Sequence, residues 1–212
     1  MKEHPIIFSI EMVQAILRGE KTQTRRIITP QPKLEDDQSF SKPEGFVDDL
    51  GYLTINQKRE FYSSITKNNF LIVSQYRKKS KYNIGDQLWV RESFGKDFFG
   101  KIYYKADDLY VPVGSKAKWK PSIHMPRSVS RIQLEIVNIE VERLQDITEE
   151  DAKAEGVKQI EEDGKVYHDY MIFKEGPYRL AFAMLWDELN FKRGFGWKEN
   201  HFVWIIEFKR IK

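Results

Sequence analysis

The chain has 212 residues, of which 41% are hydrophobic and 32% are charged, as in a globular protein large enough to bury a sizeable core. It contains no cysteine, which excludes a disulfide framework, a thiol nucleophile and a cysteine zinc site. Its apolar stretches are far shorter than the roughly 20 residues of a membrane span, and its N-terminus lacks the apolar segment of a signal peptide. We therefore expect a cytoplasmic protein without a membrane partner.

The net charge of +3 is too small to indicate nucleic-acid binding by itself. Three local basic clusters are more informative: residues 25–26, 77–81 and 116–120, the last with Trp119 among its lysines. Basic side chains around an aromatic ring are typical of surfaces that hold phosphates and stack bases. Each cluster is also explained as a solvated face, so only their convergence in space would favour a binding surface.

The first 30 residues predict a strand, a helix and a second strand. Ile6-Ile7-Phe8 is an apolar run typical of a buried strand, and Ser9 then occupies the N-cap position of a helix that Gly19 ends. The β-branched residues between 22 and 29 favour another short strand, which stops at Pro30.

Residues 31–67 show no clear periodicity, because Pro, Gly, Asp and Ser are scattered among isolated aromatic residues. We interpret them as a long irregular insertion rather than as a second domain. The sequence thus predicts a single domain that spans residues 1–212.

The second half of the chain carries the clearest β signals. Gly85-Asp86 is a predicted turn into a strand at 87–92, and residues 101–105 favour another strand. Between 131 and 144 the apolar positions alternate and then change phase, from Ile132, Leu134 and Ile136 to Val137, Ile139 and Val141. Such a phase slip predicts a β-bulge, which bends a strand as a small closed barrel requires.

Two helices and a final strand complete the predicted fold. Thr148 begins a capping-box pattern for a short helix that ends before Gly156. A second helix is expected at 178–189, with an apolar face of Leu180, Met184, Leu185, Trp186 and Leu189. Residues 202–208 are apolar on both faces, as in a strand covered on both sides. We predict an α+β fold, a small β-barrel of about six strands with two or three peripheral helices.

The most informative segment links the end of the first helix to the following strand, and reads Gly19-Glu20-Lys21-Thr22-Gln23-Thr24-Arg25-Arg26. The glycine permits a sharp turn, so the residues after it are held between two regular elements. Thr24 could then act as a nucleophile once a base removes its proton. Lys21 could be that base if burial or the neighbouring arginines lower its pKa. The alternative is that these are surface charges and that the threonines serve β propensity.

Glu155 lies in the last turn of the predicted helix that begins at Thr148. The helix dipole typically disfavours a carboxylate there by about 0.3 to 1 kcal/mol. An ion pair with Lys21, or general acid/base work, would explain this position. A solvated surface glutamate is the alternative.

Together these features resemble the ASCH family of the PUA-like superfamily. The matching segments are Gly19 to Arg26, the Gly85-Asp86 turn, the helix start Ile147-Thr148-Glu149-Glu150 leading to Glu155, and the closing Ile206-Glu207-Phe208-Lys209. Two further segments, Leu88-Trp89-Val90-Arg91-Glu92 and His124-Met125-Pro126-Arg127-Ser128-Val129-Ser130-Arg131, are similar to the longer ASCH proteins of phages and prophages.

The resemblance implies a PUA-like barrel with a cleft for RNA or a modified nucleoside, in the cytoplasm of the host if the protein is phage-encoded. Some small bacterial ASCH proteins are amidohydrolases that deacetylate 4-acetylcytidine with a lysine, a threonine and a glutamate. Those positions match Lys21, Thr24 and Glu155 here. The implied mechanism has Lys21 activate Thr24 for attack on the acetyl carbonyl carbon. Glu155 would orient the lysine or assist proton transfer to the leaving amine.

Three other functions stay open: a noncatalytic RNA-binding module, an RNA-cleaving ASCH protein, and a phage accessory protein that acts through protein contacts. The chain differs from the small amidohydrolases in its greater length, in its insertion and in Arg26, where the relatives tend to be apolar. RNA in the same cleft would contact Arg25, Arg26, Arg91, Arg127 and Arg131, with Trp89 or Trp119 as a stacking platform. Packing explains both tryptophans equally well.

No cofactor is expected from the sequence. A metal site is not expected either, because the histidines are widely spaced and form no two-ligand helical pattern; they are His4, His124, His168 and His201.

Overall fold

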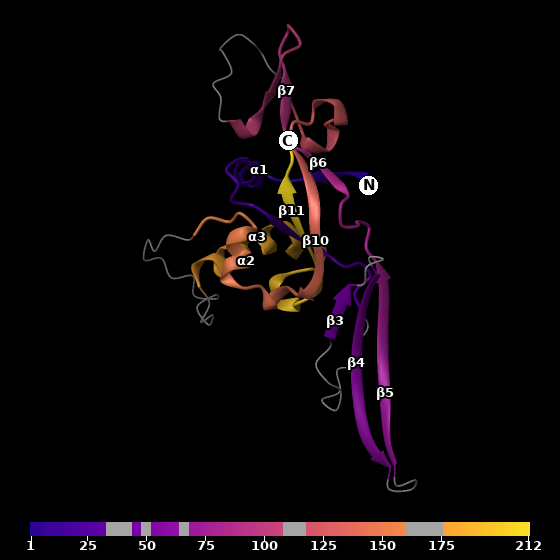
Figure 1. The fold of residues 1–212 in the computed structure, drawn as a ribbon. Helices are drawn as coiled ribbons and strands as arrows, with labels where there is room; N and C mark the ends of the chain where they lie inside the picture. The colour runs from indigo at the N-terminus through magenta and orange to yellow at the C-terminus, as the bar shows by residue number, and fades with distance from the viewer. Residues whose placement is uncertain (33–43, 48–51, 64–67, 108–117, 160–175) are drawn as a thin grey trace.

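The computed structural model describes residues 1–32, 44–47, 52–63, 68–107, 118–159 and 176–212, which form a mixed α+β fold (Figure 1). The α-helices are α1 (Ile10–Leu17), α2 (Glu149–Ala154) and α3 (Pro177–Asn190). The strands are β1 (Glu3–Ile7), β2 (Gln23–Ile27), β3 (Glu44–Val47), β4 (Tyr52–Ser63), β5 (Asn68–Lys79), β6 (Gln87–Arg91), β7 (Phe94–Lys96), β8 (Ile102–Tyr104), β9 (Lys118–Lys120), β10 (Gln133–Arg143) and β11 (Phe202–Arg210).

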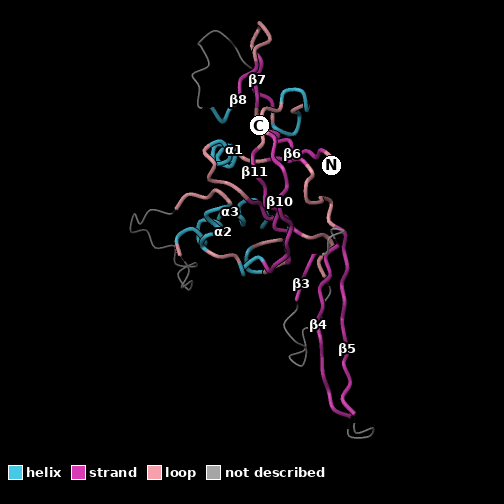
Figure 2. Tube along the Cα trace, in the orientation of Figure 1, coloured by secondary structure: helices cyan, strands magenta, loops and turns pink. Residues whose placement is uncertain are grey.

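A five-stranded sheet in the order β1-β6-β10-β11-β2 forms the centre of the molecule (Figure 2). β1 pairs with β6 in parallel, and the other neighbours pair antiparallel. β11 is buried along most of its length, as its apolar sequence predicts. The register of β10 against β11 shifts between Ile136 and Asn138, which confirms the predicted bulge.

The bulge residue is Val137, whose exposed fraction is 41%. The apolar phase therefore resumes at Ile139, which is buried, and the expectation that Val137 belongs to the inner face is wrong. The extra residue turns its side chain outward so that the residues on either side of it can stay in the core.

Two hydrophobic clusters pack on opposite sides of β11. The larger lies between the central sheet and α1, and it includes Phe8, Val13, Leu134 and Phe208. The smaller packs α2 and α3 against the other side of β11 through Phe182, Trp186, Trp197 and Val203. Because both faces of β11 are covered, the strand fixes the positions of the helices relative to the sheet.

Local capping determines where the first two helices begin. The hydroxyl of Ser9 accepts a hydrogen bond from the main-chain N–H of Met12, and Gly19 follows α1 with a φ of +77°. At α2 the Thr148 hydroxyl and the Asp151 carboxylate form the reciprocal capping box that the sequence predicts.

The interpretation of residues 31–67 as irregular is wrong for the part that the structure describes. This region contains β3 and β4, and β4 pairs with β5 over twelve residues in a long hairpin that extends from the sheet (Figure 1). Cross-strand hydrogen bonds stabilise such a ribbon without the regular apolar alternation of a half-buried strand. The rest of this interpretation concerns residues 33–43, 48–51 and 64–67, which lie outside the described residues.

The described residues also contain eleven strands in three sheets, more than the six expected. Besides the hairpin, residues 94–104 and 118–120 contribute a separate small sheet in the order β8-β7-β9. The expected number of two or three helices agrees with the three α-helices of the described chain. None of these helices combines the length and the apolarity needed to cross a bilayer.

The inner face of α3 differs from the expected one. Its buried side chains are Phe182, Ala183, Trp186 and Asn190. The expected Leu180, Met184 and Leu185 are only partly buried, and Leu189 is exposed. Phe182 packs against Trp186, four residues further along the helix, and against Trp197, and this face rotates the leucines toward the helix edge.

The bulge gives a direct test of the register of β10. Ile136→Ala should lower the free energy of unfolding by about 2 to 5 kcal/mol, because it leaves a cavity in the core. Val137→Ala, one residue further along, should change it by less than about 0.5 kcal/mol, because the side chain faces outward. Urea denaturation of both variants measures the two values, and equal losses would contradict this register.

Candidate functional site

The Lys21 side chain comes from a tight connection between α1 and β2. The main-chain N–H groups of Glu20 and Lys21 both donate to the carbonyl oxygen of Ala15. The next N–H, of Thr22, donates to the carbonyl oxygen of Ala154 at 2.9 Å, and so binds this connection to the end of α2. The segment that sequence analysis singled out is therefore held against α2.

Lys21 and Glu155 form a buried ion pair. The Lys21 Nζ donates to Glu155 Oε2 at 2.7 Å and to the Glu155 main-chain oxygen at 2.6 Å. The two side chains are 0% and 3% exposed. The predicted ion pair between them is confirmed. The ammonium group also caps the last turn of α2, and this offsets the unfavourable interaction of the Glu155 carboxylate with the helix dipole.

Arg25 extends this pair into a network with two more elements. Its guanidinium donates to Glu142 Oε1 on β10 at 2.8 and 2.6 Å, and to Glu155 Oε1 at 3.3 Å. It also lies 3.5 Å from Asp151 Oδ2 on α2. Two buried cations thus share several carboxylates, which is the pairing that buried charges require.

Burial lowers the pKa of the Lys21 ammonium from its usual value. Ion pairing with Glu155 opposes this effect, while the nearby Arg26 and Arg25 add to it. The predicted cationic influence of both arginines on this lysine therefore agrees with the structure. The Glu142 carboxyl has a raised pKa because it is buried, although Arg25 works in the opposite direction.

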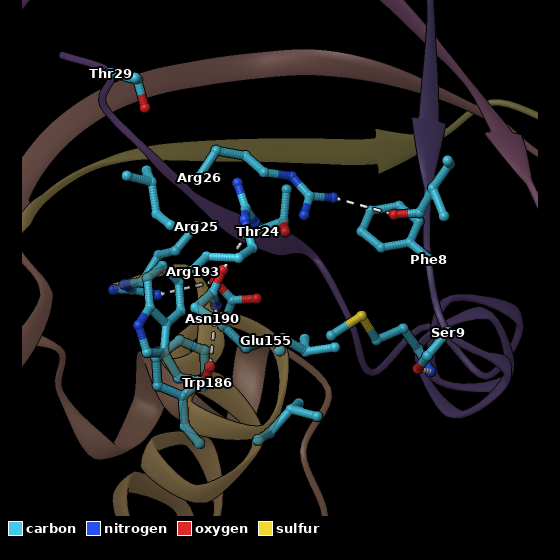
Figure 3. Close-up of a pocket in the computed structure, with 16 residues that line it drawn as sticks. Phe8, Ser9, Thr24, Arg25, Arg26, Thr29, Glu155, Trp186, Asn190 and Arg193 are labelled. Atoms are coloured by element: carbon cyan, nitrogen blue, oxygen red, sulfur yellow. Dashed lines mark hydrogen bonds and ion pairs between the residues drawn. The ribbon is translucent and has the colours of Figure 1, made fainter. Parts of the chain in front are cut away.

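Thr24 and Glu155 line the same cavity, which has a volume of about 430 Å³ (Figure 3). β2 supplies one wall, the β1–α1 connection a second and α3 a third. The lining residues are Ile7, Phe8, Ser9, Met12, Thr24, Arg25, Arg26, Ile27, Thr29, Glu155, Phe182, Leu185, Trp186, Leu189, Asn190 and Arg193. Lys21 does not line the cavity, and reaches it through the Glu155 carboxylate.

Phe8 connects the cavity to the buried charges. The Lys21 Nζ lies 5.4 Å from the centroid of its ring, and the Arg26 guanidinium carbon lies 5.5 Å from it. Arg26 also donates to the carbonyl oxygen of Ile7 at 3.2 Å. A position near the face of an aromatic ring is favourable for each cation.

Among the residues predicted to contact RNA, only Arg25 and Arg26 lie at this cavity; Trp89, Arg91, Trp119, Arg127 and Arg131 lie elsewhere. Arg131 is paired with Glu92 and Asp107, and Arg127 with Glu3. Arg91 stacks on Trp89, with its guanidinium carbon 5.5 Å from the ring centroid. The expectation of one cleft shared by all seven side chains is therefore not met.

Sequence analysis missed the wall that α3 and the turn after it provide. Trp186, Asn190 and Arg193 line the cavity there, and Arg193 donates to Asn190 Oδ1 at 3.3 Å. One signal was present, because Asn190 is a polar residue four positions after Trp186 on the buried face of the helix. No comparable signal marks Glu142, whose contact with Arg25 depends on the pairing of the strands.

Comparison with known proteins gave no assignment: no family model, no curated protein and no solved structure matched the chain.

The position of Lys21 depends on Gly156, which makes a substitution there informative. Gly156 has a φ of +81°, and a Cβ on it would lie 2.8 Å from the Cβ atoms of both Ala15 and Lys21. Gly156→Ala should lower the free energy of unfolding by about 2 to 4 kcal/mol, through backbone strain and a steric clash.

Gly194→Ala is the matched control, because Gly194 has a φ of +78° with nothing within 4 Å of the added carbon. Its free energy of unfolding should fall by only about 1 to 2 kcal/mol, because the substitution adds backbone strain but no steric clash. Urea denaturation of the two variants measures the difference. A smaller loss at Gly156 than at Gly194 would show that the connection and α2 are not in contact.

Proposed function

We propose that this chain is an ASCH-type protein that acts on RNA or a nucleoside, and that it deacetylates 4-acetylcytidine with Thr24 as the nucleophile. One observation carries the proposal: Thr24 lines a cavity beside Glu155, and that carboxylate holds the fully buried Lys21. Glu155, which is distant in sequence, thereby contacts the segment that carries Lys21 and Thr24, and this supports the roles that the family resemblance implies.

The lowered pKa of Lys21 supports a role for this residue as a base. A lysine takes up a proton from a hydroxyl only in its neutral form, and burial together with two nearby guanidinium groups favours that form. Glu155 holds the amine in place by accepting two hydrogen bonds from it, one at the carboxylate and one at the main-chain oxygen. These contacts hold the amine at a defined position, as a catalytic group requires.

In the proposed reaction, the Thr24 oxygen attacks the acetyl carbonyl carbon and its proton passes to the Lys21–Glu155 pair. The tetrahedral intermediate collapses with cleavage of the C–N bond, and the departing cytidine amine takes that proton. A water molecule then hydrolyses the acetyl-threonine ester, which releases acetate and restores the hydroxyl. The net reaction consumes one water and yields cytidine and acetate.

The cavity is compatible with a nucleoside. Its volume of about 430 Å³ lies within the usual range of about 300 to 1,000 Å³ for small-molecule sites. The Phe8 and Trp186 side chains line it and offer aromatic contacts, while Ser9 and Asn190 offer polar groups that could orient a base. We further infer that the central sheet, with its bulge at Val137, belongs to a PUA-like barrel, and that the protein works in the cytoplasm.

The direct test is turnover of 4-acetylcytidine by purified protein, followed by absorbance or chromatography. Thr24→Ala and Lys21→Met should each reduce the rate by at least about 100-fold, because each removes a group that the reaction needs. Thr24→Ser should retain measurable activity because it keeps the hydroxyl.

Thr22→Ala is the matched control, since Thr22 belongs to the same segment but its side chain is exposed. Its activity should equal that of the wild type. Absence of turnover by wild-type protein at high enzyme concentration would remove the amidohydrolase proposal.

The pH dependence of this activity follows from the lowered pKa of Lys21. The neutral amine accumulates as pH rises through that pKa, so the rate should increase with pH. It should level off below the range near 10.5 where an ordinary lysine titrates. Single-turnover rates across neutral and alkaline pH test this, and a rate that falls as pH rises would argue against a lysine base.

RNA binding without catalysis is the second candidate, favoured by Arg26 and Arg193, which line a cavity that aromatic rings also line. It predicts RNA binding that weakens with salt and weakens further in Arg26→Ala. With no turnover of 4-acetylcytidine, such binding would favour this candidate, whereas affinity independent of salt would exclude it.

A further inference from the structure

The small sheet β8-β7-β9 forms an arm, which we define as residues 94–104 and 118–120. Figure 1 shows β7 leading away from the central sheet, toward the end of the molecule opposite the β4–β5 hairpin. β7 pairs with β8 on one side and with β9 on the other. The cavity between β2 and α3 contains no residue of the arm.

The tip of the arm exposes two phenylalanines. Phe98 and Phe99 follow β7, and their exposed fractions are 94% and 92%. Their rings lie edge to face, with centroids 5.7 Å apart. Trp119 on β9 adds a third aromatic side chain, with an exposed fraction of 40%. Three exposed rings on one small sheet are unusual, because burial normally removes such rings from water.

Lysines surround these rings. Lys96 and Lys101 flank the tip, while Lys118 and Lys120 flank Trp119, and all four are exposed. Lys118 is the register partner of Lys96, so their side chains lie on the same face of the sheet. The arm contains one acidic residue, Asp97, whose carboxylate accepts hydrogen bonds from the Lys101 N–H and the Tyr103 hydroxyl.

With four lysines and one aspartate, the arm has a net charge of +3, equal to that of the whole chain. The basic cluster around Trp119 and the lysine of β7 therefore converge in space, which sequence alone could not show. Such convergence favours a binding surface over a solvated loop.

We propose that this arm binds single-stranded nucleic acid, with its rings stacked on unpaired bases and its lysines placed at the phosphates. Exposed aromatic rings among lysines have the chemistry of surfaces that hold single strands without sequence preference. Paired bases are stacked on each other and offer no free face to these rings, which favours single strands over duplexes.

The distribution of the rings favours a nucleic acid over a lipid surface. Trp119 pairs with Gly95 on β7, whereas Phe98 and Phe99 lie in the turn that follows this strand. The rings thus occupy two places on the arm, the tip and β9, and lysines lie beside both places. A single strand that crosses the arm can contact both places, whereas a membrane would meet the tip alone. The inference rests on the arm alone and holds whether or not the cavity deacetylates a nucleoside.

The test is fluorescence anisotropy of a short labelled oligouridylate titrated with the full chain. The double substitution Phe98→Ala, Phe99→Ala should weaken binding by at least about 25-fold, which corresponds to about 5-fold for each ring. The double substitution Lys118→Ala, Lys120→Ala should make the slope of log affinity against log salt concentration shallower by about 1.4, because two phosphate contacts are lost.

Two substitutions outside the arm serve as controls, Ile84→Ala for an exposed apolar side chain and Lys198→Ala for an exposed lysine. Both should leave affinity and salt slope unchanged, and all variants should unfold at the wild-type urea concentration.

Oligouridylate binding that the arm substitutions do not weaken would overturn the proposal. So would failure to bind the oligouridylate combined with sedimentation on anionic phosphatidylglycerol vesicles, since the arm would then contact lipid. Because the measurement is binding rather than deacetylation, a negative result here leaves the proposed function of the cavity untouched, and the reverse also holds.

Discussion

The buried pairing of Lys21 with Glu155 is the interaction on which the candidate site depends. An isolated charge in a dry interior costs several kcal/mol, so a charged Lys21 could not stay there without Glu155, which Arg25 also contacts. The pair joins the α1–β2 connection to the end of α2, and Arg25 extends it through Glu142 to β10. A carboxylate fixed by partners on several elements has little freedom to move, which is the condition for a precise site.

The same network separates two kinds of arginine that look alike in the sequence. Arg25 is buried and already shared among carboxylates, so its role in the fold is to neutralise them and to hold β2 against α2. Arg26 follows directly but contacts the main chain and the ring of Phe8, at the wall of the cavity. Arg131, with Glu92 and Asp107, resembles Arg25 in this respect. Charge alone therefore does not identify a ligand contact.

The two proposed sites depend on different physical properties. The cavity derives its character from burial, because Thr24 lines it together with Glu155, whose carboxylate holds the buried Lys21. The arm derives its character from exposure, because only rings and lysines that reach solvent can meet a flexible strand. Their separation on the fold allows each to be tested without disturbing the other.

The sequence by itself determined the local features: the caps at Ser9 and Thr148, the glycine turn before Lys21, the bulge in β10 and the buried β11. Each depends on near neighbours in the chain, and hence leaves a periodicity or a capping pattern. Only the tertiary structure decided that Glu142 meets Arg25, that α3 forms a cavity wall, that β4 and β5 pair, and that lysines gather on the arm. Most of these contacts join residues far apart in the chain, so no local pattern records them. β4 and β5 are neighbours in the chain, but their sequences lack the apolar alternation of a half-buried strand.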